Sequence, residues 1–552
     1  MSLIETRREQ MFPTLTPEQI EVASRFASGP ARRFEPGEVM FDIGQRNAPV
    51  WLVQEGAIDV VRRDGLGHEE PIISELPGQF SGEVSQLGGR ASLAEGRAGP
   101  EGCTALPFDP PDLRALVIGT AELGEILMRA FILRRLGLLE STSAGSILVG
   151  RRNTPDIVRL QGFLTRSGYP HSVLCAADPE AQDLIRRLGV RDDEMPLMIC
   201  PNGTVLRRPT DAEAGLCLGM TPELDRDHVF DVAVVGAGPA GLATAVYAAS
   251  EGLSVVVFDQ RAMGGQAGAS ARIENYLGFP TGISGQALAG RAFTQAQKFG
   301  AELAIPLQVT KLDCGDDSAG RSGLLRLVLA NGEDVQARSV VIATGALYRR
   351  PDIPNLEMFE GAGVSYWASP IEARMCEGAE VSLVGGGNSA GQAVVFLASR
   401  VQHLHLIVRG PGLESSMSRY LIDRIRALPN VTLHTHTEIA ALEGERCQGL
   451  TAVVFRDRRT GAEHRCASRH LFLFVGADPN TRWVEGCVER DAHGFVMTGV
   501  ERDGGRPVAP LETSRRRVFA IGDARAGSTK RVAAAVGEGA AVVAQIHQAL
   551  AD

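Results

Sequence analysis

The sequence predicts a multidomain protein in which an N-terminal β-roll precedes units of mixed α/β structure. The 552-residue length exceeds what one hydrophobic core usually supports. Residues 34–78 alternate apolar and polar side chains between glycine-rich turns, which is typical of half-buried strands. Further along the chain, apolar strands alternate with helical segments, which is typical of parallel sheets.

Composition and charge narrow the class of protein. The chain is 44% hydrophobic and 22% charged, as in ordinary globular proteins. With 56 basic and 66 acidic side chains its net charge is -10, which opposes binding to phosphate backbones, so we expect no nucleic-acid partner. No apolar run approaches the roughly 18 residues that cross a bilayer, and the first residues lack a signal-peptide stretch. We therefore expect a cytoplasmic protein without membrane insertion.

The nine cysteines form no C-x-x-C pair and show no metal-like spacing. We therefore expect most of them to be small buried hydrophobic residues and predict no metal site.

Residues 1–140 predict a helix over about 16–26, a small β-barrel or roll, and a helical stretch over 112–139. The order of Pro36-Gly37-Glu38, Gly44, Gly56, Pro77-Gly78 and Gly82-Glu83 resembles the cyclic-nucleotide-binding domain family. That resemblance implies a ribose contact at Gly82-Glu83 and a cyclic-phosphate contact at Arg90, although Arg90 follows at a shorter spacing than the family pattern. A ligand-free docking or regulatory barrel is the favoured alternative.

Residues 141–222 follow the order strand, helix, strand, helix and hairpin, which resembles a thioredoxin or glutaredoxin fold. The resemblance implies a cis peptide at Met195-Pro196. The redox C-x-x-C of such folds should fall at Arg151-Arg152-Asn153-Thr154, where no thiol is present. We therefore expect a redox-inactive spacer or docking domain.

A dinucleotide-binding fingerprint begins after a buried-type strand at residues 230–235. Gly236 allows a tight turn, Gly238 lets the backbone approach a pyrophosphate, and Gly241 packs the following helix on the strand. The fingerprint also includes Pro239 and Ala240 at the helix N-terminus, which faces the phosphates with its positive end. Asp259, at the end of the next strand, can accept hydrogen bonds from ribose hydroxyls.

A second fingerprint follows a strand at residues 379–384. It comprises Gly385, Gly387, Asn388, Ser389 and Ala390, so the sequence predicts two Rossmann-type folds and two dinucleotides. The position that matches Asp259 is Val408, and Arg409 comes next. Loss of the acid and gain of a guanidinium favour NADP over NAD, with a solvated arginine as the alternative.

Near the end of the chain, a strand stops at Gly522-Asp523 and a helix follows. A carboxylate at this position could bind flavin ribityl hydroxyls, while the helix N-terminus faces the pyrimidine ring.

These motifs resemble the low-molecular-weight thioredoxin reductase family over residues 228–552. Further matches are Gly264-Gly265-Gln266, Glu274-Asn275-Tyr276, Ala343-Thr344-Gly345-Ala346 and Lys530-Arg531-Val532-Ala533. The resemblance implies FAD bound by residues 229–347 and 475–552, NADPH bound by an inserted domain at 348–474, and NADH as an alternative donor. It places Gln266, Asn275, Asp523 and Arg531 at the flavin and Arg409 at the adenosine phosphate, and it adds Thr344, Gly345, Gly522 and Val532 as cofactor-binding residues.

The chain departs from the family at its redox motif. Where members carry C-x-x-C, this sequence has Trp367-Ala368-Ser369-Pro370, so no catalytic residue is assigned there and the usual thiol relay cannot operate. Trp367 has two equal interpretations: a ring that stacks near flavin or nicotinamide, or plain packing. The family's second arginine is also missing after Arg409, and Arg419 could compensate.

The resulting hypothesis is an NAD(P)H-dependent flavoprotein oxidoreductase that passes hydride from NADPH to FAD and electrons onward to an unidentified acceptor. The acceptor could be an iron–sulfur protein, a quinone, dioxygen or a partner disulfide, docked through the N-terminal domains. Two alternatives stay open: a redox or nucleotide sensor with little turnover, and a thioredoxin-disulfide reductase that uses Cys376. We also expect a homodimer, because both nucleotide-binding architectures commonly pair.

Overall fold

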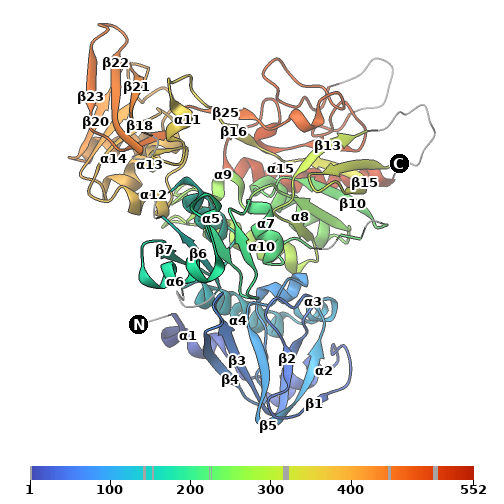
Figure 1. Ribbon diagram of the computed structural model, residues 1–552. Coiled ribbons are helices and arrows are strands. Elements are labelled where there is room, and N and C mark those ends of the chain that lie inside the picture. The colour runs from blue at the N-terminus through green and yellow to red at the C-terminus, as the bar shows by residue number, and fades with distance from the viewer. Residues whose placement is uncertain are drawn as a thin grey trace.

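The computed structural model describes residues 3–140, 145–151, 154–222, 224–225, 227–314, 323–445, 449–500 and 508–551. Figure 1 shows the N-terminal β-rich unit at one end, the unit around β6 and β7 next to it, and two larger α/β units beyond. The predicted Arg152 and Asn153 lie outside the described residues. No helix in the described ranges is both long enough and apolar enough to span a membrane.

The N-terminal unit is a five-stranded antiparallel sheet packed on helices. Its helices are α1 (Leu3–Met11), α2 (Pro17–Ser24), α3 (Pro110–Gly119) and α4 (Ala121–Glu140), and its strands are β1 (Arg32–Phe34), β2 (Val39–Phe41), β3 (Val50–Arg63), β4 (Glu69–Glu75) and β5 (Glu95–Phe108). Thr16 caps α2 by accepting a hydrogen bond from the backbone N–H of Gln19. The predicted 112–139 helix is two helices, because the chain turns at Thr120, which has extended backbone angles.

The next unit has a four-stranded sheet in the order β7-β6-β8-β9. Its strands are β6 (Ser146–Gly150), β7 (His171–Cys175), β8 (Leu197–Ile199) and β9 (Val205–Arg207), and its helices are α5 (Pro155–Arg166), α6 (Pro179–Leu188) and α7 (Asp211–Cys217). β6 runs parallel to β7 and antiparallel to β8. The Met195–Pro196 peptide is cis, as the sequence predicts.

The first nucleotide fold is built on a seven-stranded sheet in which β12, β11, β10, β15 and β26 are mutually parallel neighbours. Its strands are β10 (Val229–Val235), β11 (Val255–Phe258), β12 (Glu302–Ala304), β13 (Val309–Asp313), β14 (Leu325–Leu329), β15 (Asp334–Ile342) and β26 (Val518–Ala520). Helices α8 (Pro239–Ser250), α9 (Gly265–Gly268), α10 (Gly285–Lys298) and α15 (Val532–Ala551) belong to this unit. β26 comes from near the C-terminus of the chain. The sequence of the second nucleotide fold is therefore inserted between two strands of this sheet.

The second nucleotide fold has a five-stranded parallel sheet in the order β17-β24-β18-β19-β20. Its strands are β17 (Val364–Ser365), β18 (Glu380–Val384), β19 (His403–Ile407), β20 (Val431–His434) and β24 (His470–Leu473), with helices α11 (Leu356–Phe359), α12 (Pro370–Met375), α13 (Asn388–Ala398) and α14 (Arg419–Ala427). A three-stranded antiparallel sheet of β21 (Thr437–Glu445), β22 (Gly449–Asp457) and β23 (Glu463–Cys466) packs on it.

The two nucleotide folds are joined by a pair of short strands. β16 (Ala346–Tyr348) pairs antiparallel with β25 (Ala477–Pro479), so the chain leaves the first fold and returns to it at adjacent points. Multidomain α/β architecture with Rossmann-like sheets is therefore confirmed.

Four of the nine cysteines, for which we expected mostly small buried hydrophobic residues, form disulfides. Cys200 pairs with Cys217, and Cys314 pairs with Cys487. These partners are 17 and 173 residues apart in sequence, so spacing alone did not reveal them. Cys103, Cys376 and Cys466 are free and buried, as expected, while Cys447 lies outside the described residues.

Candidate functional site

A cavity of about 1240 Å³ lies where the two nucleotide folds meet. Its walls come from both folds and from α5 of the preceding unit. The predicted residues that line it are Gly236, Gly238, Pro239, Ala240, Asp259, Gln266, Asn275, Thr344, Gly345, Trp367, Asn388, Ser389, Gly522, Asp523, Arg531 and Val532. The structure thus brings together residues that are almost 300 positions apart in sequence.

The first glycine turn joins β10 to α8 with very little free space. Gly236 has a left-handed φ of 112°, and a Cβ there would overlap the carbonyl oxygen of Ala343. A Cβ on Gly241 would overlap the carbonyl oxygen of Gly236. Gly238 is the N-cap of α8, and no side chain caps this helix. The first-turn N–H groups of α8 are therefore available for an anion.

Asp259 follows β11 and anchors the glycine turn. Its carboxylate accepts hydrogen bonds from the backbone N–H groups of Ala237 at 3.0 Å and Arg261 at 2.9 Å. Burial raises the pKa of Asp259, and these hydrogen bonds oppose that shift. Because it both fixes the turn and lines the cavity, Asp259 can present its remaining acceptor capacity to a ribose.

The segment after β26 closes the cavity at the N-terminus of α15. Gly522 has a left-handed φ of 64°, and a Cβ there would press on Ala240 at 3.1 Å. Burial raises the pKa of the neighbouring Asp523 carboxyl, while Lys530 opposes the shift. Lys530 donates to the backbone oxygen of Asp523 at 2.7 Å, and Arg531 is exposed next to it. The helix start, Asp523 and Arg531 together form one polar wall.

Four further predicted residues line the same space from the first fold. The Gln266 amide donates to the backbone oxygen of Ala346, and the Thr344 hydroxyl donates to that of Asn480 at 2.6 Å. Gly345 has a left-handed φ of 62°, and Asn275 is exposed to the cavity.

The second glycine turn joins β18 to α13. Gly385 has a φ of 148°, and Ala390 is buried against it, with its Cβ 3.0 Å from where a Gly385 Cβ would lie. Gly387 is the N-cap of α13, again without a side-chain cap, and a Cβ there would meet nothing within 4 Å. Only Asn388 and Ser389 of this fingerprint reach the cavity wall. The Asn388 side chain accepts a hydrogen bond from the N–H of Ser418 at 2.7 Å.

Arg409 is exposed just beyond β19 and does not line the cavity. Arg419, the possible substitute for the family's second arginine, pairs with Asp423 at 2.9 Å on the outer surface of α14. The two guanidinium groups therefore differ in their pairing, because Arg419 already has a carboxylate partner in Asp423.

The segment at residues 367–370 leads into a helix. Ser369 is the N-cap of α12, with Pro370 as its first residue, and Glu372 completes a capping box with Ser369. The indole N–H of Trp367 donates to the same Glu372 carboxylate at 3.0 Å. Trp367 is thus held by hydrogen bonding as well as by packing while it lines the cavity.

Two arginines that sequence analysis missed lie over the Trp367 ring. The Arg166 guanidinium, from the end of α5, is 5.7 Å from the ring centroid, and that of Arg261 is 5.9 Å away. Tyr348 lies 6.4 Å from the same ring on the cavity wall. No motif indicates these contacts, because they depend on how the unit around β6 and β7 docks on the nucleotide folds.

Cys376 has the environment of a structural thiol. It is fully buried at the end of α12, and burial raises its pKa to about 11. Its thiol donates to the backbone oxygen of Ala373 at 3.6 Å. A buried, protonated thiol is a poor nucleophile for disulfide exchange.

The N-terminal unit uses Arg90 for docking. Its guanidinium donates to the backbone oxygen of Leu303 at 3.0 Å and lies over the Phe293 ring at 4.8 Å, both in the first nucleotide fold. The sequence-based assignment of Arg90 to a cyclic phosphate therefore does not fit its position. Glu83, the other predicted contact, lies 3.5 Å from Arg135 of α4.

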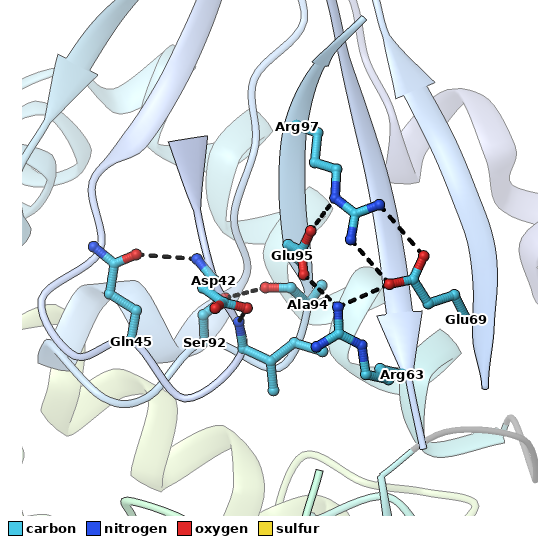
Figure 2. A network of polar contacts seen from close by, with 9 residues as sticks. Asp42, Gln45, Arg63, Glu69, Ser92, Ala94, Glu95 and Arg97 are labelled. Atoms are coloured by element: carbon cyan, nitrogen blue, oxygen red, sulfur yellow. Dashed lines mark hydrogen bonds and ion pairs between the residues drawn. The ribbon is translucent and has the colours of Figure 1, made fainter. Parts of the chain in front are cut away.

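Two other barrel arginines are paired with acids. Figure 2 shows Arg63 and Arg97 each between Glu69 and Glu95. Arg63 contacts both carboxylates at 2.8 Å, and Glu95 is almost fully buried. These two guanidinium groups balance the charges of Glu69 and Glu95 on the five-stranded sheet.

The residues of the large cavity fit FAD and a second dinucleotide. The volume exceeds the roughly 300–1,000 Å³ of drug-sized sites, as an extended dinucleotide requires. Side chains at Gly236 and Gly241 would overlap backbone oxygens at or beside the turn, and both fingerprint helices begin without a side-chain cap. The donor set, uncapped helix ends with flanking carboxylates and arginines, suits pyrophosphate and ribose groups.

Comparison with known proteins identifies the C-terminal part. Residues 230–539 match the family model described as pyridine nucleotide-disulphide oxidoreductase. The chain is 32% identical over 318 residues to a component of the alkyl hydroperoxide reductase of Escherichia coli, covering 58% of each chain. It is 33% identical over 329 residues to thioredoxin reductase of Mycolicibacterium smegmatis, covering 59% of this chain and 97% of that one.

Thioredoxin reductase of Lactococcus lactis is a similar solved structure. It aligns with a TM-score of 0.53 at 25% identity, over 58% of this chain and 99% of that one. The match spans less than two thirds of the length of the alkyl hydroperoxide reductase component. Since the family model covers more than half of the sequence, the chain belongs to the pyridine nucleotide-disulphide oxidoreductase family, the NAD(P)H-dependent flavoenzymes.

Proposed function

We propose that this chain oxidises NAD(P)H through FAD and passes the electrons to an acceptor other than a disulfide beside the flavin. The second part of the proposal, that the acceptor is not a disulfide beside the flavin, rests on one observation. Among the described residues, no cysteine lines the cavity, and both disulfides lie away from it. Trp367 and the capping box of α12 occupy the segment that we align with the family's redox motif.

Within this proposal, the chain binds and orients the two cofactors. The first glycine turn and α8 would hold the FAD pyrophosphate, Asp259 the adenosine ribose, and Asp523 with the α15 N-terminus the other end of the flavin. The second turn and α13 would hold the NAD(P)H pyrophosphate. When bound, the pair supplies hydride transfer from nicotinamide to flavin.

The acceptor is proposed to reach the flavin from outside the chain. Quinones, dioxygen, iron–sulfur proteins and partner disulfides remain the candidate classes, with a protein acceptor docked through the N-terminal units. A screen of NADPH oxidation rates against one representative of each class tests this. We expect turnover with at least one acceptor that needs no enzyme thiol, and unchanged turnover after Cys376→Ser. Turnover confined to disulfides and abolished by Cys376→Ser would contradict the proposal.

NADPH is the proposed donor, with NADH as the alternative. The support is Arg409, an exposed guanidinium directly after Val408, where the first fold has Asp259. A 2'-phosphate can pair with this guanidinium, and no carboxylate repels it at that position. Homodimer formation and a cytoplasmic location are also proposed, by likeness to the same family.

A sensor function is a second candidate, favoured by one contact. Arg166 of the thioredoxin-like unit lies over Trp367 on the cavity wall, so cofactor occupancy could change how the N-terminal units dock. Under this alternative, NADPH would change the proteolysis pattern of residues 3–222 while the turnover rate stayed low with every acceptor.

A further inference from the structure

A group of metal-binding side chains lies at the far side of the second nucleotide fold. Glu380, His405 and Cys466 each offer a ligand atom, and these atoms all lie within 4.8 Å of one another. His405 and Cys466 are buried, while the Glu380 side chain is 39% exposed. We call these three residues, with the adjoining His434, the His405 cluster.

Sheet register explains why these residues meet. Glu380 is the first residue of β18, and His405 lies in the middle of β19 opposite Ser382, so both side chains are on one face of the parallel sheet. Cys466 is the last residue of β23, in the antiparallel sheet that covers this face. The cluster therefore connects two sheets through three strands that are far apart in sequence.

The contacts orient the His405 ring toward the other two ligands. Its Nε2 lies 2.6 Å from Glu380 Oε1, and Cys466 Sγ lies 3.4 Å from the same oxygen. Its Nδ1 lies 2.9 Å from His434 Nε2. One ring nitrogen is thus fixed by a hydrogen bond to His434 while the other faces a carboxylate and a thiol, which is the usual arrangement of a metal-ligating histidine.

The spacing needs only a small adjustment to accept a metal ion. Zinc bonds of roughly 2.0–2.3 Å in a tetrahedron separate ligand atoms by about 3.3–3.7 Å. The sulfur-to-oxygen distance already has this value, and Nε2 and Oε1 must separate by less than about 1 Å. The partly exposed Glu380 side chain can move by that amount.

Ser382 adds a further polar group to this pocket. It is fully buried next to His405 in the sheet register, and its hydroxyl, which has no hydrogen bond of ordinary geometry among the described residues, faces the Cys466 thiol. Buried hydroxyls are usually satisfied by protein or by ordered solvent. A metal-bound solvent molecule beside the cluster would supply such a partner.

The His405 cluster is separate from the dinucleotide site. Glu380 begins β18, whereas the second glycine turn follows the other end of that strand at Gly385. Five residues of extended chain separate them by roughly 16 Å. A ligand at the cluster would therefore not contact a dinucleotide bound at the turn.

We propose that Glu380, His405 and Cys466 bind a zinc ion, with His434 positioning the His405 ring and a solvent molecule completing the coordination. Imidazole, thiolate and carboxylate are all zinc ligands, and a three-ligand site leaves one position for solvent. Binding releases the Cys466 thiol proton to solvent and replaces its hydrogen bond to Glu380 by a bond to the metal. The ion ties β23 to β18 and β19.

Metal titration of the full-length flavoprotein tests this proposal. After removal of metal with a chelator, zinc is titrated against a chromophoric competitor, and cobalt is used as a spectroscopic probe. We expect one zinc ion per chain and a sulfur-to-cobalt charge-transfer band. Cys466→Ser should remove that band, and Glu380→Gln should weaken zinc binding without risk to the core. His434→Gln should weaken it by about 10- to 100-fold.

Matched variants separate this site from adventitious binding. Cys103→Ser changes another free, buried cysteine, and His493→Gln changes a histidine outside the cluster, so both should bind zinc like the unchanged chain. Flavin content and circular dichroism confirm folding of each variant. Less than stoichiometric zinc in the unchanged chain, or equal zinc affinity and cobalt spectra after Cys466→Ser and Glu380→Gln, would overturn the proposal.

Discussion

Gly241 sets how closely α8 approaches the strand before it, and the proposed FAD site depends on this close approach. A Cβ there would overlap the backbone oxygen of Gly236, which cannot move without moving the whole turn. We predict that Gly241→Ala lowers FAD affinity by at least about tenfold, or about 1.4 kcal/mol. Equilibrium dialysis of FAD against the apoprotein measures this.

The control for that variant is Gly290→Ala. Gly290 is within α10 of the same fold, and a Cβ there would meet nothing within 4 Å. Alanine should stabilise the helix by roughly 1 kcal/mol and leave FAD affinity unchanged. Equal FAD affinity in both variants would show that the glycine turn does not hold the cofactor.

Arg409 carries the proposed preference for NADPH. Replacing it by alanine removes a charge-assisted contact of about 1.5–3 kcal/mol, so KM for NADPH should rise at least about tenfold while KM for NADH stays constant. Steady-state kinetics with each donor measure the two values. Arg419→Ala, which removes a guanidinium already paired with Asp423, is the matched control. Parallel changes for both donors after Arg409→Ala would exclude a role at the 2'-phosphate.

At the level of elements, a buried contact between an arginine and a carboxyl group holds α4 against the five-stranded sheet. Arg134 of α4 lies 3.2 Å from Glu75 of β4, and it also donates to the backbone oxygens of Met11, Phe80 and Gly82. Burial raises the pKa of Glu75 to about 7, with Arg134 opposing the shift. The position of α4 thus depends on contacts around a carboxyl group whose ionised form is disfavoured by burial.

This pair predicts how barrel stability depends on pH. Between the unfolded pKa of 4.5 and the folded pKa of about 7, the folded barrel keeps a proton that the unfolded chain has lost. Stability therefore falls as pH rises through this window, by at most about 3 kcal/mol from this group. Glu75→Gln should remove this fall in stability with rising pH. Urea unfolding, detected by proteolysis within residues 32–108, measures the stability at each pH. The control variant Glu21→Gln, at an exposed site, should keep the fall in stability. A curve of stability against pH for Glu75→Gln that runs parallel to that of the unchanged chain would refute this account.

Helix α12 is built on the segment that the sequence comparison of motifs aligns with the family's redox motif. Ser369, Pro370 and Glu372 are a good helix start, and Glu372 also binds the Trp367 indole. These contacts give the segment a structural role. Arg166 and Arg261 over the same ring place this helix at the junction of three units.

At the scale of the whole molecule, Arg90 links the barrel to the first nucleotide fold. Arg90→Ala removes both the hydrogen bond to Leu303 and the contact with the Phe293 ring. We predict faster hydrogen exchange in α10 with unchanged flavin content, measured by mass spectrometry. The exposed Arg25→Ala, which loses only a surface pair with Glu21, should show no change. Unaltered exchange after Arg90→Ala would mean that the barrel docks by other contacts.

Short sequence patterns were sufficient to predict the two nucleotide folds, because their motifs lie within short stretches of the chain. Glycine turns, flanking strands and caps are set by neighbours in the chain, so both nucleotide turns could be anticipated. The cis Met195–Pro196 peptide was anticipated from the resemblance of its unit to a known fold. Strand β5 was missed, because its glycines and prolines hide the alternation of a long strand.

Contacts between distant segments could not be anticipated in the same way. The docking of Arg90, the Arg166–Trp367 contact and the two disulfides depend on how units pack together. The His405 cluster has the same origin, since its ligands lie on three strands and leave no C-x-x-C spacing to detect. Sequence spacing alone therefore could not indicate this cluster, and the prediction of no metal site stays a prediction that zinc titration tests.

Anaerobic mixing of the purified flavoprotein with NADPH in a stopped-flow spectrometer tests the central claim most directly. We predict a yellow protein whose flavin absorbance is lost within the first turnover time. The rate of this loss should saturate with NADPH concentration. The same behaviour is expected when Cys376 is replaced by serine. A protein that binds no FAD on reconstitution, or whose bound flavin is not reduced by NADPH or NADH, would contradict the account.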